Sequence, residues 1–276
     1  MKLILFSKML KDRSIDALAD LAASLGIDGY DLAVRPGHPV NPDNVAEALP
    51  RAAATLRARG FDIPMITANT DLVDATAVGV DTLLAAMAAA EVPRVKLGYY
   101  KIDLSVDYWA AVDVCREKLA SWGEKARSHG VQVLYHTHSN RCMGLNAGML
   151  AHLLRGLDPR GVGAYLDTGH LTGEGEEFAV ALAMQKEHLS AVSLKDFLMQ
   201  REVHNGHGRK ARNVVEAGQG MTDFTAAFEC LHGIGYTGPA SIHCEFEVDA
   251  AGFEAAVKRE AAFFVGLRRR IFGAES

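Results

Sequence analysis

Short apolar stretches rich in β-branched residues alternate along this chain with longer stretches of helical spacing, and the alternation repeats eight times. The expected strands are residues 2–6, 29–34, 63–67, 94–98, 131–136, 162–167, 191–195 and 240–245. The first helical stretch is capped by Ser14 and ends at Gly26. A long one follows the fourth strand and ends near residue 129, and the others are expected at 43–59, 76–90, 146–155, 176–187, 223–232 and 250–272. Eight strand–helix cycles within about 250 residues favour a closed parallel barrel. The sequence therefore predicts one α/β domain over residues 1–276, a (β/α)₈ TIM barrel.

An open doubly wound sheet is the main alternative to this barrel. It lacks support because no Gly-x-Gly-x-x-Gly sequence follows the first strand, and for the same reason we expect no nucleotide cofactor. After the seventh strand the polar stretch 196–220 is expected to be a long loop. Loops of this length in a compact domain are usually functional, so its HNGHGRKARN segment is a predicted lid.

The overall charge and the cysteines narrow the range of partners. A net charge of −5 does not suit a nucleic-acid partner, which usually needs a basic domain. No run of 18 apolar residues occurs, so no membrane partner is expected. The cysteines, at positions 115, 142, 230 and 244, are too widely spaced for a zinc knuckle and are expected to be reduced. The N-terminus shows no signal-peptide pattern, so the expected location is cytoplasmic.

Ionisable side chains gather where the expected strands end, and in a barrel these ends lie together. The last four strands contribute His136, His138, Asp167, His170, Ser193, Lys195, His243 and Glu245, and earlier strands add Lys8, Arg35, His38, Thr67, Asn69, Lys96 and Tyr99. Each residue alone also has a structural explanation, such as a cap or a hydrogen-bonded loop residue. Burying so many ionisable groups at one end costs several kcal/mol unless they are paired or bind a metal. The pattern therefore predicts a functional site there.

Several segments together resemble a known family. They are LILFSK, GIDGYDLAVRPG, YLDTGH, SLKDF, GQGMTDF and GYTGPASIHCEFE, and they extend over nearly the whole chain. These segments are similar to those of the sugar phosphate isomerase/epimerase superfamily, the xylose isomerase-like TIM barrels. The resemblance implies the barrel fold, and it says less about the reaction.

The resemblance also implies a divalent-metal site, formed by a glutamate, an aspartate, a histidine and a glutamate on strands five to eight. Asp167 matches the aspartate, and His170 matches a substrate-facing histidine three residues later. The other three metal positions fall on His136, Ser193 and His243, so the usual four-ligand set is not kept.

Two alternatives remain open for the metal. His136, Asp167 and His243 can bind a divalent ion (Mn, Zn, Mg or Fe), either alone or with Glu245, and the two imidazoles shift the preference away from Mg²⁺. Alternatively no metal is bound, and the histidines, Lys195 and Glu245 act on the substrate directly.

The resemblance implies an isomerase or epimerase for a small hydroxylated substrate, a sugar, sugar acid or sugar phosphate. It would remove a proton next to a carbonyl and form an enediolate. Glu245 is the predicted base, His138 or His170 returns the proton or orients hydroxyls, and Lys195 or the metal stabilises the oxyanion. The predicted substrate-binding residues are Arg35, His38, Tyr99 and Arg212, with Arg209 as a further candidate.

Three other functions are weighed against this one. A lyase, such as a dehydratase for a small cyclic hydroxy acid, would use the same acid and base groups. A ligand-binding barrel without turnover would explain the metal position lost at Ser193. A DNA-repair endonuclease is disfavoured, because its three-zinc site needs more ligands and the acidic charge opposes phosphate binding. A homo-oligomer is left open, since related barrels are often dimers or tetramers.

Overall fold

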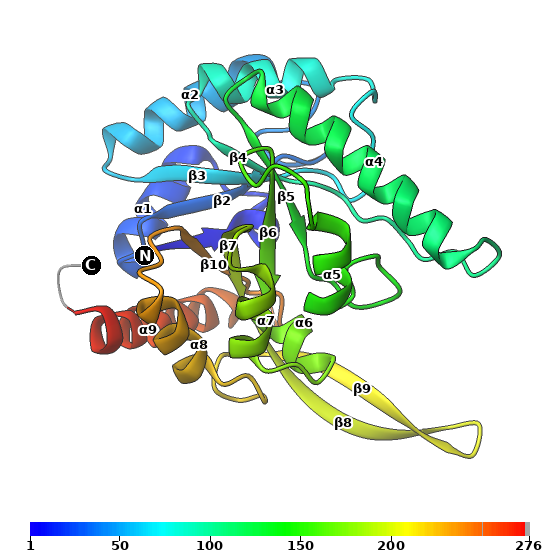
Figure 1. Ribbon diagram of the computed structural model, residues 1–276. Coiled ribbons are helices and arrows are strands. Elements are labelled where there is room, and N and C mark those ends of the chain that lie inside the picture. Colours follow the sequence, from blue (N-terminus) through cyan, green and yellow to red (C-terminus); the bar gives the residue numbers. More distant parts are fainter. Residues whose placement is uncertain (250, 274–276) are drawn as a thin grey trace.

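The computed structural model describes residues 1–249 and 251–273, and within them eight parallel strands close into a barrel (Figure 1). Around the barrel the strand order is β1-β10-β7-β6-β5-β4-β3-β2. The strands are β1 (Lys2–Phe6), β2 (Gly29–Ala33), β3 (Asp62–Thr67), β4 (Arg94–Lys96), β5 (Gln132–His136), β6 (Val162–Asp167), β7 (Leu189–Leu194) and β10 (Pro239–Ile242). The predicted (β/α)₈ barrel is confirmed. Two strands end earlier than predicted, β4 before Gly98 and β10 before Glu245.

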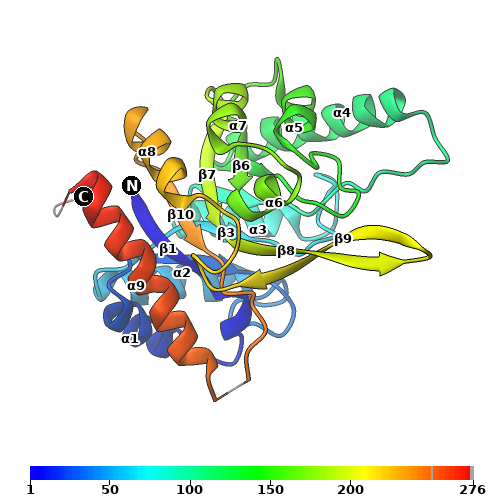
Figure 2. The same cartoon turned by 90° about the horizontal axis from the view of Figure 1, so that it is seen from below.

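Helices surround the barrel on its outside (Figure 2). They are α1 (Ile15–Leu25), α2 (Val45–Ala58), α3 (Val80–Ala89), α4 (Tyr108–Arg127), α5 (Ala147–Leu154), α7 (Phe178–Gln185), α8 (Phe224–Gly233) and α9 (Phe253–Phe272), with the short turns η1 (Ser7–Leu10) and α6 (Thr168–Gly173) at strand ends. Ser14 and Gly26 bound α1 as predicted. The third helix begins later than predicted, because the Asp74 side chain accepts hydrogen bonds from Thr76 and holds that segment in a turn. The predicted start of the last helix, residue 250, lies outside the described residues.

The hydrophobic core is divided between two places. A large cluster fills the space between strands and helices. A smaller one closes the barrel interior and consists of Ile4, Met65, Leu134, Tyr165 and Ala191. The barrel is therefore a packed core and not a pore, so a ligand has to bind above this layer, at the strand ends. Within residues 1–249 and 251–273, we find no helix with the length and apolar character that a membrane span needs.

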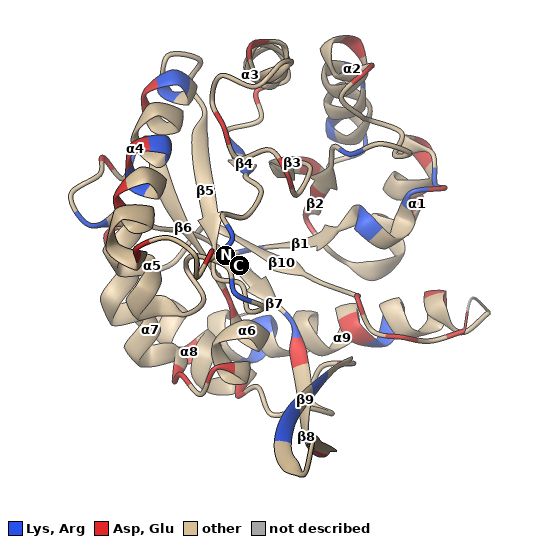
Figure 3. Cartoon of the chain, turned by 90° about the vertical axis from the view of Figure 1, so that its right-hand side faces the viewer, with Lys and Arg blue, Asp and Glu red and all other residues tan. Residues whose placement is uncertain are grey.

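The stretch after the seventh strand is not the predicted long loop. It forms an antiparallel hairpin, β8 (Asp196–His204) and β9 (His207–Val215), which projects beyond the barrel (Figures 1 and 2). Asn205 and Gly206 both have positive φ, 51° and 78°, which is the geometry of the tight turns that Asn-Gly favours. That dipeptide in HNGH was the overlooked sign of a hairpin. Basic residues are conspicuous along this arm (Figure 3).

Glu260 on α9 is a buried acid outside the strand-end region. Its Oε2 accepts a hydrogen bond from the Ala217 N–H at 2.7 Å, whereas its Oε1 has no partner among the described residues. Burial, together with the nearby Glu216 and Asp196, raises the pKa of Glu260 to about 8. The folded protein therefore holds this proton over a pH range in which the unfolded chain has lost it.

We expect Glu260→Gln to remove one pH-dependent contribution to stability. Between the ordinary pKa of 4.5 and the folded value of about 8, the contribution of Glu260 to the free energy of unfolding should fall with pH, by up to about 5 kcal/mol. Glutamine keeps the acceptor for Ala217 and cannot ionise, so the advantage of the wild type over the variant should shrink by this amount as the pH rises. Urea denaturation of both proteins at pH 5, 7 and 9 measures the difference, with exposed Glu229→Gln as the control. A difference between the wild type and the Glu260 variant that is the same at all three pH values would contradict the assignment.

Candidate active site

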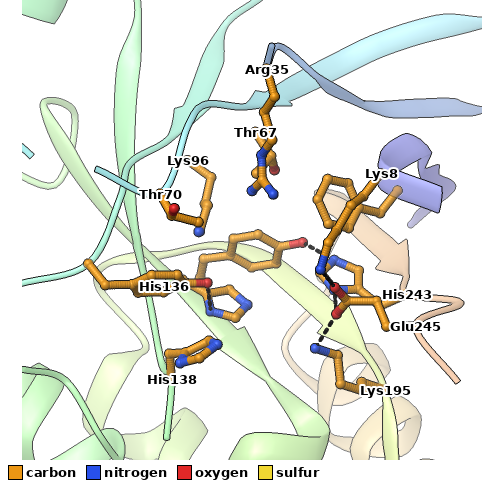
Figure 4. Close-up of a pocket in the computed structure, with 13 residues that line it drawn as sticks. Lys8, Arg35, Thr67, Thr70, Lys96, His136, His138, Lys195, His243 and Glu245 are labelled. Carbon is orange, nitrogen blue, oxygen red and sulfur yellow. Dashed lines mark hydrogen bonds and ion pairs between the residues drawn. The ribbon is translucent and has the colours of Figure 1, made fainter. Parts of the chain in front are cut away.

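A pocket enclosing about 430 Å³ opens at the strand ends (Figure 4). Its lining residues come from all around the barrel: Phe6, Lys8, Arg35, Thr67, Thr70, Lys96, Tyr99, His136, His138, Tyr165, Lys195, His243 and Glu245. Most of the residues predicted from the strand ends thus meet in one cavity. This is the place where barrels of this type carry their chemistry.

An ion pair between Lys195 and Glu245 lies at one side of the pocket. The Lys195 Nζ is 2.5 Å from Glu245 Oε2 and 3.8 Å from Asp167 Oδ2, and Lys8 contacts the other oxygen of Glu245. Burial alone would lower the pKa of Lys195, but Asp167 and Glu245 raise it above its usual value. Burial acts to raise the pKa of Glu245, but Lys195, His243 and Lys8 together hold it far below its usual range. Both groups are therefore charged at neutral pH.

Asp167 lies behind the pocket wall, at the end of β6, and is fully buried. Its carboxylate accepts hydrogen bonds from the Ser193 Oγ–H at 2.7 Å and from the backbone N–H of His170 at 2.8 Å. The second of these bonds caps the N-terminus of the short helix α6. Burial would raise its pKa, but His170, Lys195 and His136 together lower it well below the usual value. Asp167 is thus an ionised acceptor that holds Lys195 in place. Ser193, the position at which the resemblance implies a metal-binding histidine, donates to this carboxylate.

Three predicted histidines lie close to one another and are neutral. Burial lowers the pKa of each of His136, His138 and His170 to about 3. The rings of His138 and His170 are 4.2 Å apart, and His170 Nδ1 lies 2.9 Å from Ser139 Oγ, so His170 stands behind the lining rather than in it. At neutral pH the two that line the pocket, His136 and His138, can exchange hydrogen bonds with substrate hydroxyls, but they carry no charge.

The predicted metal ligands fit a metal only in part. His136 Nε2 is buried without a hydrogen-bond partner and lies 3.4 Å from Asp167 Oδ2, as two ligands of one ion would. The Nε2 of His243 is engaged elsewhere, 3.0 Å from the Tyr165 hydroxyl. Its Nδ1 is 3.6 Å from Glu245 and has no hydrogen-bond partner among the described residues. Across residues 1–249 and 251–273, no group of three or more potential ligands is placed to hold an ion. The arrangement does not fit the three-residue site.

Two of the predicted substrate-binding residues are not in the pocket lining. Arg212 is on β9, where it forms an ion pair with Glu174 at 2.9 Å and lies over the Phe197 ring. His38 is in the bend after β2 and is half-buried outside the pocket. Arg35 and Tyr99 do line it. A position in a loop near a strand end does not decide the direction of a side chain, so the substrate-binding roles of Arg212 and His38 stay predictions.

The strand-end rule missed a buried network beneath the pocket. Asp31, in the middle of β2, accepts hydrogen bonds from Thr67 at 2.7 Å, Ser241 at 3.2 Å and Tyr165 at 3.3 Å. Burial raises the pKa of Asp31. Through Tyr165 this network orients His243. A carboxylate inside the otherwise apolar strand GYDLA was the available signal.

Comparisons with known proteins agree with this fold. Inosose dehydratase of Lacticaseibacillus casei is 29% identical over 160 residues, 55% of this chain and 52% of that protein. Inosose dehydratase of Geobacillus thermodenitrificans is 28% identical over 156 residues, 53% of this chain and 51% of that protein. The chain thus spans about half the length of the curated relatives it matches.

Solved structures extend the likeness to almost the full length, at identities that show the fold alone. The 3-keto-D-glucoside 4-epimerase YcjR of E. coli has a TM-score of 0.75 at 16% identity, covering 96% of this chain and 99% of its own. IOLI protein with a binding zinc atom has a TM-score of 0.75 at 16% identity, covering 99% and 100%. The family model for the xylose isomerase-like TIM barrel matches residues 19–265. The chain therefore belongs to the xylose isomerase-like TIM barrel family.

Proposed function

We propose that this chain is an isomerase that removes a proton next to the carbonyl of a small hydroxylated substrate and forms an enediolate. The observation that carries the proposal is the Lys195–Glu245 pair, a carboxylate base and an ammonium group 2.5 Å apart in the pocket. The similar proteins are named as epimerases and dehydratases. Epimerisation of a hydroxy ketone next to its carbonyl and β-elimination of water from it both begin with this proton abstraction.

In this proposal Glu245 takes the proton and Lys195 binds the developing oxyanion. In the free site the ammonium group of Lys195 lowers the pKa of Glu245, which makes the carboxylate a weak base. When a substrate carbonyl accepts a hydrogen bond from Lys195, the ammonium group interacts less strongly with the Glu245 carboxylate. The basicity of Glu245 then rises when the substrate is in place, and Asp167 keeps Lys195 within reach.

The number of carboxylates bears on the type of product. Among the described residues that line the pocket, Glu245 is the one carboxylate. A single base removes and returns a proton on the same face of the substrate, which moves a proton between neighbouring carbons. Inversion of a carbon needs a second proton-transferring group on the opposite face, and the described lining offers no second carboxylate for that role. This favours isomerisation over epimerisation.

Dehydration is the second candidate, and one contact favours it. Lys8 reaches Glu245 beside Lys195, so a second ammonium group lies next to the base. Elimination of water needs a base for the proton and an acid for the departing hydroxyl, and Glu245 with Lys8 would supply both.

Proton NMR in D₂O tests the proposal on a panel of ketoses, keto acids, sugar phosphates and cyclic hydroxy ketones. We expect deuterium to enter the substrate next to the carbonyl, together with an isomeric product and no change in composition. Loss of water would support dehydration instead. No exchange with any member of the panel, by protein whose fold is confirmed by circular dichroism, would contradict the proposal.

Removal of divalent metals is expected to change turnover by less than about twofold, because Lys195 already supplies the positive charge for the oxyanion. Metal content by mass spectrometry, on the wild type and on His136→Ala with Asp167→Ala, accompanies the chelator experiment. A stoichiometric ion whose removal abolishes turnover, and which the double variant loses, would instead support the metal site predicted from the sequence.

A further inference from the structure

The pocket holds more basic side chains than its one carboxylate can pair with. Its lining contains Lys8, Arg35, Lys96 and Lys195. Two of them, Lys8 and Lys195, are paired with Glu245. Within residues 1–249 and 251–273, Arg35 and Lys96 have no carboxylate at ion-pair distance. The pocket therefore has two basic side chains that form no ion pair with the protein.

Lys96 is the less expected of these two basic side chains. It is the last residue of β4 and is only 3% exposed, and its ammonium group lies over the Tyr99 ring, 3.7 Å from the centroid. A buried ammonium group without an anion is costly, and such groups are usually kept for a function. Burial, and next to it Arg35, lowers the pKa of Lys96 well below its usual value. An anion bound beside Lys96 would remove this cost and favour the charged form.

Arg35 is also held in a position from which it can contact an anion in the pocket. Its Nε donates a hydrogen bond to the Ala68 carbonyl oxygen at 3.1 Å, and its guanidinium carbon is 5.5 Å from the centre of the Phe6 ring. These contacts restrain the side chain and leave its terminal nitrogens facing the pocket (Figure 4). A guanidinium fork matches two oxygens of a carboxylate or phosphate.

The buried acid Asp31 acts on Lys96 but forms no ion pair with it. Asp31 raises the pKa of Lys96 only in part against burial, and its carboxylate accepts hydrogen bonds from the hydroxyl groups of Thr67, Ser241 and Tyr165. In Figure 4, Arg35 and Lys96 enter the pocket from one side, and Lys195 and Glu245 lie at the other.

We propose that Arg35 and Lys96 bind an anionic group of the substrate, a carboxylate or a phosphate, while Glu245 and Lys195 act on its carbonyl end. This rests on the proposed function and narrows its substrate to a sugar acid, keto acid or sugar phosphate. A neutral sugar would leave both basic side chains unpaired. The anion holds one end of the substrate, and the carbonyl is thereby directed to Lys195.

Isothermal titration with inorganic phosphate, with malonate and with neutral myo-inositol tests the site without knowledge of the substrate. The variants are Arg35→Gln and Lys96→Met, and the matched control is Lys11→Met, which removes an exposed lysine. We expect each pocket variant to weaken binding of the preferred anion at least about tenfold, and the control to stay within about twofold. Tighter binding of inorganic phosphate indicates that the anionic group of the substrate is a phosphate, and tighter binding of malonate indicates a carboxylate.

Several outcomes separate this proposal from the proposed function. Anion binding that is absent, or unchanged in both pocket variants, overturns the anion site even if deuterium exchange is seen. If anion binding depends on Arg35 but no substrate shows deuterium exchange, the proposed isomerase function is overturned and the proposed anion site is supported. If Lys96→Met fails to fold, Arg35→Gln decides alone. Where exchange is found, Arg35→Gln should raise KM for anionic substrates at least about tenfold, and the control Lys11→Met should leave it within about twofold.

Discussion

Glu245→Gln is expected to lower kcat about 100- to 10,000-fold, with little change in KM, because the amide cannot accept the proton from the substrate. The substitution keeps the size of the side chain and leaves Lys195 beside Asp167, so the pocket should keep its shape. Deuterium exchange and product formation by NMR measure the effect on the substrate found in the panel. Glu247→Gln is the matched control, since Glu247 is an exposed glutamate two residues further along the chain.

The outcome distinguishes two roles of Glu245. If Glu245→Gln loses exchange and still binds substrate, the carboxylate acts as the base. If turnover stays within about threefold of the wild type, Glu245 is not the base and serves only as the partner of Lys195. In that case another acceptor in the pocket has to be sought, and the neutral His138 would be the first to replace.

Lys195→Met is expected to lower the free energy of unfolding by about 3–5 kcal/mol and to abolish measurable turnover. It removes the ammonium group between two carboxylates, so that Asp167 is left buried without this cation and Glu245 loses one of its two lysine partners. The oxyanion also loses its charged hydrogen-bond donor. Urea denaturation measures the stability, and the exchange assay measures the activity.

Lys8→Met is the matched control for stability. Lys8 touches the same glutamate, but its side chain is 41% exposed, whereas that of Lys195 is 7% exposed. A surface ion pair contributes little, so we expect a loss of less than about 1 kcal/mol. Adding Asp167→Asn to Lys195→Met should recover part of the loss, because it removes one of the unpaired carboxylates. Equal losses for Lys8→Met and Lys195→Met would contradict the central position of Lys195.

Local sequence patterns were sufficient to predict the barrel. Its strands are buried on both faces and therefore read as apolar runs, and its helices carry caps such as Ser14 and Gly26. The same reasoning located the site, because ionisable residues at parallel strand ends have to meet at one rim. Where the local signal was overlooked, as at Asn205–Gly206, the prediction was wrong: a hairpin was taken for a loop.

Which charged groups pair could not be predicted in this way. Lys8 and Glu245 are 237 residues apart, and they meet only because β1 and β10 close the barrel. The unpaired state of Arg35 and Lys96 is likewise a property of the finished pocket. The sequence by itself determined the positions of the strands and the end of the barrel at which chemistry is expected, because both follow from local patterns. Only the tertiary structure decided which cation balances which carboxylate, since those distances depend on barrel closure and on the burial that it creates.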